Sequence, residues 1–293
     1  MRGAILNLER FGELFMKWNI IADSSCDLFD LEKASADISY LNVPFIINIE
    51  EREYIDDELL DTSELIIAMK ESRKASSTAC PSPEAWLEKM DKDAYNICVT
   101  ISKNLSGSYN SALIATKMFN ENGASGKAAI VDGRATGPSA VLAVRKLTEL
   151  IEQGLEFEEV ILKTEEYIVD MRTVFALSCF DNLIKAGRMG KLTGVLAASL
   201  DFRGVGVEED GRIKFKAKVR GKKKMIETML DVMRENTFNG GEVVISHCHN
   251  EVLAQKLSEE IKGVWNNTDI TIMPTRGLNS YYAEKGGLIV SYR

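Results

Sequence analysis

Two hydroxyl-rich segments carry the side chains best suited to hold an acid. The first, Ser76–Pro83, contains Thr78, and the second, Ile101–Ser108, contains Ser106 and Gly107. Each runs into the expected start of a helix, where backbone N–H groups lack partners and attract an anion. No strong base or cluster of metal ligands accompanies the hydroxyls. The residue types favour holding an acid over breaking a bond, although serine and threonine also commonly serve only to cap or bend a loop.

The first half of the chain is expected to position these hydroxyls at one edge of a sheet. Apolar runs and helix-capping residues predict strands that largely alternate with helices. The expected strands cover residues 19–23, 43–49, 95–101 and 128–132, and the expected helices cover 63–72, 82–90, 106–119 and 138–153. Such an order predicts a mostly parallel, Rossmann-like sheet, which binds ligands at the carboxyl ends of its strands.

The second half has a different pattern, with a predicted hairpin and several isolated strands. Strands are expected at 173–179, 204–208, 213–219, 242–246, 270–273 and 287–292, and helices at 157–171, 181–186, 192–200, 224–235 and 252–262. This order favours an α+β domain with a largely antiparallel sheet. We therefore expect an α/β protein of two domains, 18–165 and 166–293, which can exchange segments, after an extension over residues 1–17.

A basic strand is expected in the hairpin of the second half of the chain. Arg212, Lys214, Lys216, Lys218 and Arg220 alternate with apolar residues, which predicts one basic and one apolar face. A basic face protects the edge of a sheet against aggregation or docks an acidic partner. The net charge of −8 and the lack of aromatic residues on the basic face argue against nucleic acid.

Other catalytic and metal-binding patterns are weak. The two histidines, His247 and His249, would need further metal ligands from distant residues, so a polar turn is the better interpretation. No phosphate-binding loop, dinucleotide motif or nucleophile elbow occurs, and we expect no catalytic residue, metal or cofactor. The alternative is an enzyme acting on a small acidic or phosphorylated metabolite, with Asp23 or Asp132 as its base.

Composition indicates a cytoplasmic protein. Five scattered cysteines without a Cys-x-x-Cys pair are typical of reduced thiols. No apolar run approaches the roughly 20 residues that a membrane span needs. Residues 1–15 place charges inside an apolar stretch, which argues against a signal peptide and favours a dispensable extension or a mis-set start.

Five motifs, in order over residues 18–293, resemble the DegV family of bacterial fatty-acid-binding proteins. They are Asp23-Ser24-Ser25-Cys26-Asp27, Thr78-Ala79-Cys80-Pro81-Ser82, Leu105-Ser106-Gly107-Ser108-Tyr109-Asn110-Ser111-Ala112, Lys185-Ala186-Gly187-Arg188 and Lys218-Val219-Arg220-Gly221-Lys222-Lys223-Lys224. The resemblance implies a protein that is not itself catalytic. It implies that one long-chain fatty acid is sequestered between two domains and presented to a separate ATP-dependent fatty acid kinase.

The resemblance also implies which residues hold the acid. The family's carboxylate contacts fall on Thr78 and Ser106, beside Gly107. The family's C-terminal His-x-Gly-Pro-Gly block falls near residues 275–279, where no histidine stands. Arg276 is then expected either to replace that histidine at the carboxylate or to be a surface or turn arginine.

A docking surface for the kinase is expected among the cations. Arg188 and Arg203 lie in motifs that the comparison with the family places around the pocket entrance. Together with Lys214, Lys216 and Lys218, they are expected to meet an acidic surface on the kinase.

Overall fold

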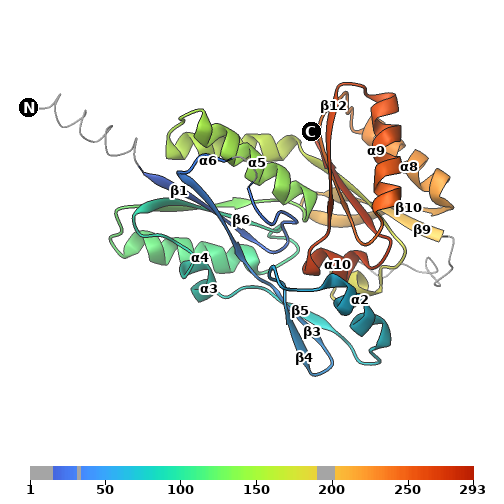
Figure 1. Cartoon of the computed structure of the whole chain (residues 1–293), viewed down its shortest axis with the longest axis horizontal. Coiled ribbons are helices and arrows are strands. Elements are labelled where there is room, and N and C mark those ends of the chain that lie inside the picture. Colours follow the sequence, from blue (N-terminus) through green and yellow to red (C-terminus); the bar gives the residue numbers. More distant parts are fainter. Residues whose placement is uncertain (1–15, 32–33, 190–201) are drawn as a thin grey trace, which may run out of the picture.

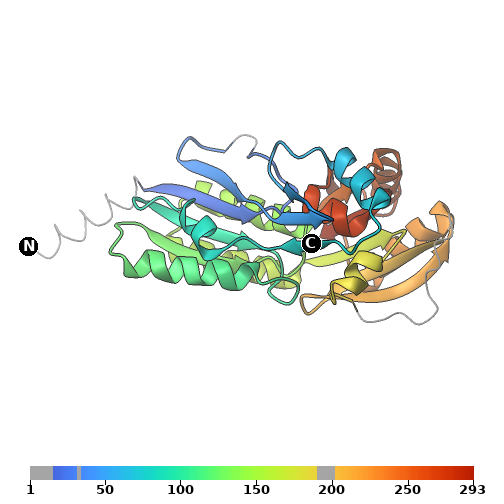
Figure 2. The ribbon, with the colours of Figure 1, turned by 90° about the horizontal axis from the view of Figure 1, so that it is seen from below.

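The computed structural model describes residues 16–31, 34–189 and 202–293, and Figure 1 shows how their helices and strands are arranged. A parallel sheet and a larger, mostly antiparallel sheet lie at opposite ends of the long axis, and Figure 2 shows the same division from below. The expected α/β class is confirmed. Residues 1–15 of the predicted extension and the predicted helix at 192–200 lie outside the described residues.

The first sheet is parallel throughout and has the order β2-β1-β6-β7. Its strands are β1 (Lys17–Asp23), β2 (Ile38–Val43), β6 (Ala94–Thr100) and β7 (Lys127–Asp132). The surrounding helices are α3 (Pro83–Leu87), α4 (Ser108–Glu121), α5 (Pro138–Glu152) and α6 (Phe157–Asp170). Because strand side chains alternate between faces, Ile21 packs with α3 and α4 while Ile20 packs with α5 and α6. Helices therefore cover both faces of the sheet.

Pro44 separates two strands that the sequence predicted as one over residues 43–49. Proline has no N–H to donate to a ladder, and the chain leaves the parallel sheet after Val43. It then enters a small antiparallel sheet of order β4-β3-β5. Its strands are β3 (Ile46–Ile49), β4 (Arg52–Ile55) and β5 (Ser77–Ala79), with α2 (Thr62–Glu71) between β4 and β5. Thr78 therefore lies on a strand, paired with Ile47, rather than in a loop.

The large sheet has the order β10-β9-β8-β13-β11-β12, and its strands pair antiparallel except for β11 with β12. Its strands are β8 (Arg172–Leu177), β9 (Phe202–Glu209), β10 (Arg212–Arg220), β11 (Gly241–His247), β12 (Thr268–Pro274) and β13 (Leu288–Tyr292). The hairpin predicted around residues 209–211 is confirmed as the turn between β9 and β10.

The two faces of the large sheet have different coverings. One face packs against α8 (Lys222–Glu235) and α9 (Glu251–Val264), and includes Val174 and Ala176 of β8. The alternate residues Phe175 and Leu177 turn toward α7 (Asp181–Lys185) and α10 (Gly277–Ala283). This second face lies toward the parallel-sheet domain and provides one wall of the cavity described below.

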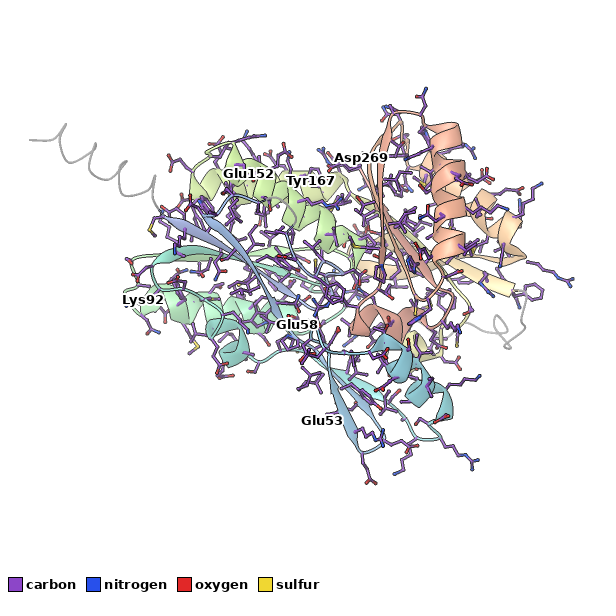
Figure 3. The ribbon with its side chains drawn as sticks, in the orientation of Figure 1. Glu53, Glu58, Lys92, Glu152, Tyr167 and Asp269 are labelled. Carbon is purple, nitrogen blue, oxygen red and sulfur yellow. The ribbon has the colours of Figure 1, made fainter. Side chains whose placement is uncertain are left out.

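Helices α5 and α6 connect the parallel sheet to the large sheet. The hydroxyl of Tyr167 on α6 donates a 2.6 Å hydrogen bond to Glu242 at the start of β11, and Figure 3 shows Tyr167 beside the large sheet. Tyr167 and Ile168 belong to the core of the parallel-sheet domain. A boundary at residue 165 would divide α6, so we propose that the second domain begins at Arg172, the first residue of β8.

Candidate functional site

A cavity of about 150 Å³ lies where the three sheets meet. Most of its lining is apolar. The apolar lining residues include Phe45, Ile101, Leu105, Phe175, Leu177, Leu183, Leu278 and Ile289, and the polar ones include Thr78, Ser106, Thr136, Asn279 and Tyr282. Both predicted hydroxyl segments therefore contribute to one cavity, together with Gly107.

Thr78 is held in place by β5 and by α10. Its backbone is fixed by pairing of β5 with β3. Its Oγ1 lies 3.0 Å from the hydroxyl oxygen of Tyr282, a half-buried residue of α10 that also lines the cavity. A hydroxyl can donate one hydrogen bond while accepting others, so this pair can give one donor to a ligand oxygen.

Ser106 and Gly107 lie at the first turn of α4. Ser106 Oγ accepts a 3.2 Å hydrogen bond from the N–H of Ser108, and Gly107 is the N-cap residue. A Cβ added to Gly107 would lie 3.4 Å from the Sγ of Cys80, which shows how closely the two hydroxyl segments approach. The first turn of α4 contains no acidic residue. The positive end of this 14-residue helix lies next to Ser106 and Gly107.

Asp23 fixes the second hydroxyl segment through buried hydrogen bonds, a role that the sequence alone did not reveal. Its carboxylate accepts hydrogen bonds from the Ser108 hydroxyl at 2.6 Å and the Ile101 N–H at 3.0 Å. Burial raises the pKa of Asp23, although these hydrogen bonds oppose that shift. Asp23 does not line the cavity and acts by positioning the second hydroxyl segment. Its place in the Asp-Ser-x-x-Asp motif was the available signal.

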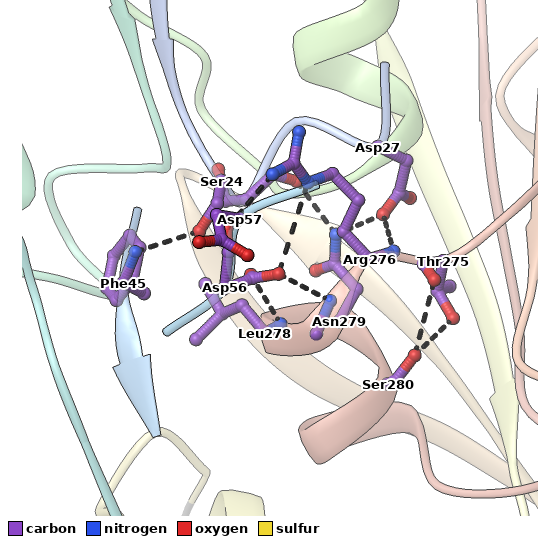
Figure 4. A network of polar contacts seen from close by, with 12 residues as sticks. Ser24, Asp27, Phe45, Asp56, Asp57, Thr275, Arg276, Leu278, Asn279 and Ser280 are labelled. Atoms are coloured by element: carbon purple, nitrogen blue, oxygen red, sulfur yellow. Dashed lines mark hydrogen bonds and ion pairs between the residues drawn. The ribbon is translucent and has the colours of Figure 1, made fainter. Parts of the chain in front are cut away.

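Arg276 has contacts that differ from those expected. Its guanidinium donates to the carbonyl of Asp56 at 2.9 Å and its Nε lies 4.0 Å from an oxygen of the Asp56 carboxylate. It also lies over the ring of Phe29. Figure 4 shows this buried network, in which Asp27 accepts the N–H of Arg276 at 2.8 Å. Arg276 is not among the residues that line the cavity, so its expected place at the ligand carboxylate has no support in this geometry.

The residues that follow Arg276 do reach the cavity, and sequence reasoning missed them. Leu278, Asn279 and Tyr282 line it from α10. Asn279 donates to Asp27 at 2.8 Å and accepts from the Thr136 hydroxyl at 2.6 Å. Burial raises the pKa of Asp27 to about 6. The buried network thus anchors the start of α10, which delivers these lining residues.

The prediction that the cations of β10 share one face is wrong. A β-bulge lies between Phe215 and Ala217, which pair with the neighbouring residues Gly206 and Val205. Neighbouring residues of a strand point to opposite faces, so the alternation reverses at the bulge. Lys214 is opposite Val207 and Lys218 is opposite Gly204, and these two lysines lie on different faces.

Several of the expected docking cations already have partners. Lys214 pairs with Glu209, Lys216 pairs with Glu235 at 2.6 Å, and Lys218 lies 4.5 Å from the ring centroid of Phe202. Arg203 is half-buried, and its Nη1 donates to the carbonyl of Phe202 at 3.0 Å. Exposed Arg188 lines the cavity, as does Arg212.

The acids considered as bases for an enzyme lie outside the cavity. Asp132 accepts hydrogen bonds from the N–H groups of Lys103 and Arg134, and Asp23 is wholly buried. His249 contacts Thr62 at 3.1 Å and does not line the cavity. Within residues 16–31, 34–189 and 202–293, no three His, Cys, Asp or Glu side chains form a group able to hold a metal ion.

No helix in the described ranges has the length and apolar character needed to cross a membrane.

The DegV family model, whose description is of uncharacterised proteins, matches residues 17–292. A DegV domain-containing protein of Streptococcus pneumoniae is 37% identical over 278 residues, which are 94% of this chain and 99% of that protein.

Solved structures resemble this fold over nearly its whole length. The fatty acid kinase B3 protein of Streptococcus pneumoniae, loaded with linoleic acid, matches with a TM-score of 0.91 and 37% identity, over 95% of this chain and 99% of that one. A DegV family protein from Eubacterium eligens, loaded with heptadecanoic acid, matches with a TM-score of 0.89 and 32% identity, over 94% and 98% of the two chains.

Proposed function

The chain belongs to the DegV family, and we propose that it binds one long-chain fatty acid in the cavity between its sheets. The observation that carries the proposal is an apolar cavity whose wall includes Thr78 of β5 and Ser106 just before the start of α4. The fatty acids held by the two similar solved proteins support the same ligand class. In this proposal, Thr78, Ser106 and Gly107 surround the carboxylate.

The energetics suit a fatty acid. Burial of a chain of about sixteen carbons gains on the order of 12 kcal/mol, at about 0.8 kcal/mol per methylene. Association costs on the order of 4–15 kcal/mol, so the tail supplies most of the affinity. The carboxylate must still be paired, because an unpaired buried charge costs several kcal/mol. Hydroxyls beside the N-terminus of a helix provide that partner.

The cavity must widen to take such a ligand. Its volume of about 150 Å³ is that of an engineered cavity which binds benzene. A long acyl chain needs several times as much space, so lining side chains have to move on binding. Exposed Arg188 and half-buried Tyr282 lie in this wall and are the side chains we expect to shift.

The protein is proposed to act in the cytoplasm with a partner kinase. The site offers hydroxyls and backbone N–H groups to a carboxylate. The two candidate bases, Asp23 and Asp132, accept hydrogen bonds from backbone N–H groups outside the cavity. We therefore assign phosphorylation of the bound acid to a separate ATP-dependent kinase rather than to this chain. The name of the fatty acid kinase B3 protein supports such a partner, and the five free cysteines suit a reducing compartment.

Lipid extraction from the purified protein tests the proposal. We expect mass spectrometry to find about one long-chain fatty acid per protein molecule. Delipidated protein should rebind palmitate or linoleate in a calorimetric titration. Incubation with ATP and fatty acid should yield no acyl phosphate. Failure to bind any fatty acid, or turnover of a small acidic metabolite by the delipidated protein, would support the enzyme instead.

A further inference from the structure

A second, larger cavity adjoins the first. It has a volume of about 550 Å³ and lies between the loop after β7, the end of α6, the turn between β9 and β10 and the end of α8. Ala135, Thr173 and Glu208 line both cavities, so the two spaces meet at a common wall. The carbonyl of Ala135 accepts the N–H of Ser102, whose own carbonyl accepts the N–H of Ser106. The wall and the second hydroxyl segment are therefore one hydrogen-bonded unit.

Some of the charged residues that line the second cavity are paired with an opposite charge, and others have no such partner in the described ranges. Lys216 and Glu235 neutralise each other, and Glu209 pairs with Lys214. Three of the lining charges that remain are Arg134, Arg172 and Glu208. A further lining charge, Asp210, belongs to the exposed turn between β9 and β10.

Arg134, Arg172 and Glu208 line the same cavity. Both arginines lower the pKa of Glu208, so both guanidinium charges are felt at its carboxylate, although burial raises that pKa overall. A Glu208 oxygen also accepts the N–H of Gly211 at 2.6 Å. Guanidinium and backbone N–H groups are partners that a phosphate also takes. An oxyanion in this cavity would therefore meet the same two arginines as the Glu208 carboxylate.

Arg134 is held at this position by an unusual backbone. Its φ of 56° is a left-handed conformation that costs energy for an arginine and persists only where neighbours fix it. Its N–H donates to Asp132 at 3.0 Å, and its carbonyl lies 3.6 Å from where a Cβ of Gly211 would be. Among the described residues, no hydrogen bond or ion pair engages its half-buried guanidinium. Arg172, by contrast, donates to the carbonyls of Val169 and Met171.

We propose that the second cavity binds a phosphate-type oxyanion between Arg134 and Arg172, in competition with the carboxylate of Glu208. The anion is either free inorganic phosphate or the phosphate head group of a lipid whose chain lies in the first cavity. The lipid source rests on the proposed function, whereas the free ion does not. Arg134 and Arg172 do not line the first cavity, so a fatty acid would bind without them.

Calorimetric titration of the full chain separates the two sources. The probes are inorganic phosphate, dodecyl phosphate and dodecanoate, and the variants are Arg134→Gln and Arg172→Gln, with exposed Arg73→Gln as the matched control. We expect each variant to lower the affinity for dodecyl phosphate at least tenfold and the affinity for dodecanoate less than threefold. If the variants lose affinity for inorganic phosphate alone, the natural ligand is the free ion. If they lose affinity for both inorganic phosphate and dodecyl phosphate, the ligand is a lipid head group. Equal affinities of wild type and variants for both phosphate probes would overturn the proposal.

Glu208→Gln provides a test in which binding is gained. Removing the competing charge should raise the affinity for inorganic phosphate at least fivefold, a result that misfolding cannot produce. Weaker or unchanged phosphate binding by this variant would contradict the proposed competition. If dodecanoate fails to bind to any variant or to the wild type while phosphate binding still depends on Arg134, the fatty-acid function fails and the oxyanion site stands.

Discussion

The two walls of the first cavity are built differently. The wall from the parallel-sheet domain carries hydroxyls on a backbone fixed by buried hydrogen bonds, as Ser106 is through Ser108 and Asp23. The wall from the large sheet consists mainly of apolar side chains, such as Phe175, Leu177 and Ile289. Directional groups recognise a head group, whereas apolar groups recognise length and volume. Changes in the two walls should therefore affect binding in different ways.

The largest expected effect tests whether Arg276 belongs to the polar wall. Arg276→Met leaves the Asp56 carboxylate without its buried guanidinium partner, which should lower the free energy of unfolding by about 3–5 kcal/mol. Affinity of the folded protein for palmitate should change less than threefold. Urea unfolding and calorimetry measure the two quantities. Exposed Arg73→Met is the control for stability. A tenfold loss of palmitate affinity in Arg276→Met would show that Arg276 does contact the ligand carboxylate.

The next effect concerns pH and the network that anchors α10. The pKa of Asp27 is raised by burial from 3.8 to about 6 in the folded protein, so the folded state binds the proton more tightly than the unfolded state. Its contribution to stability is complete below about pH 4 and is lost as pH rises through 6, by up to roughly 3 kcal/mol. Asp27→Asn should flatten this decline in urea unfolding from pH 4 to 7. The exposed control Asp37→Asn should retain it.

Single substitutions of the head-group hydroxyls should have a smaller effect, independent of chain length. Thr78→Val and Ser106→Ala each remove one hydrogen-bond partner of the carboxylate and should weaken binding by about 1–3 kcal/mol. The loss should be the same for acids of eight, twelve and sixteen carbons. Ser77→Ala is the matched control, since the neighbouring side chain on β5 points to the other face. Wild-type affinity in the Thr78→Val/Ser106→Ala double variant would remove both hydroxyls from the site.

Much of the polar wall could be predicted from sequence because its signals are local. Hydroxyls near helix starts and the alternation of strand and helix indicated Thr78, Ser106 and Gly107, and all three line one cavity. Non-local contacts were harder to predict. Asn279 and Tyr282 reach the cavity through Asp27 and Asp56, which lie more than 200 residues earlier in the chain. Nothing in the sequence around Arg276 specifies those partners.

The apolar wall and the basic strand show a second limit. Phe175 and Leu177 have the same pattern as ordinary core residues, so a cavity beside them leaves no mark in the sequence. The period of two in residues 212–220 predicted one basic face, but a single bulged position reverses the alternation. A one-residue bulge changes the direction of every later side chain without changing the composition of the strand.

The smallest expected effect depends on chain length and distinguishes the apolar wall. Leu183 of α7 is buried and lines the cavity, whereas the next residue, Ile184, does not. Leu183→Phe should reduce the space for the tail and cost about 0.8 kcal/mol for each methylene displaced. The loss should be negligible for an eight-carbon acid and grow to about 1–2 kcal/mol for a sixteen-carbon acid. Ile184→Phe controls for overpacking around α7. Calorimetry over a series of chain lengths should thus show a changed slope for Leu183→Phe and a constant offset for Ser106→Ala. An equal loss at every length would mean that this wall does not recognise the tail.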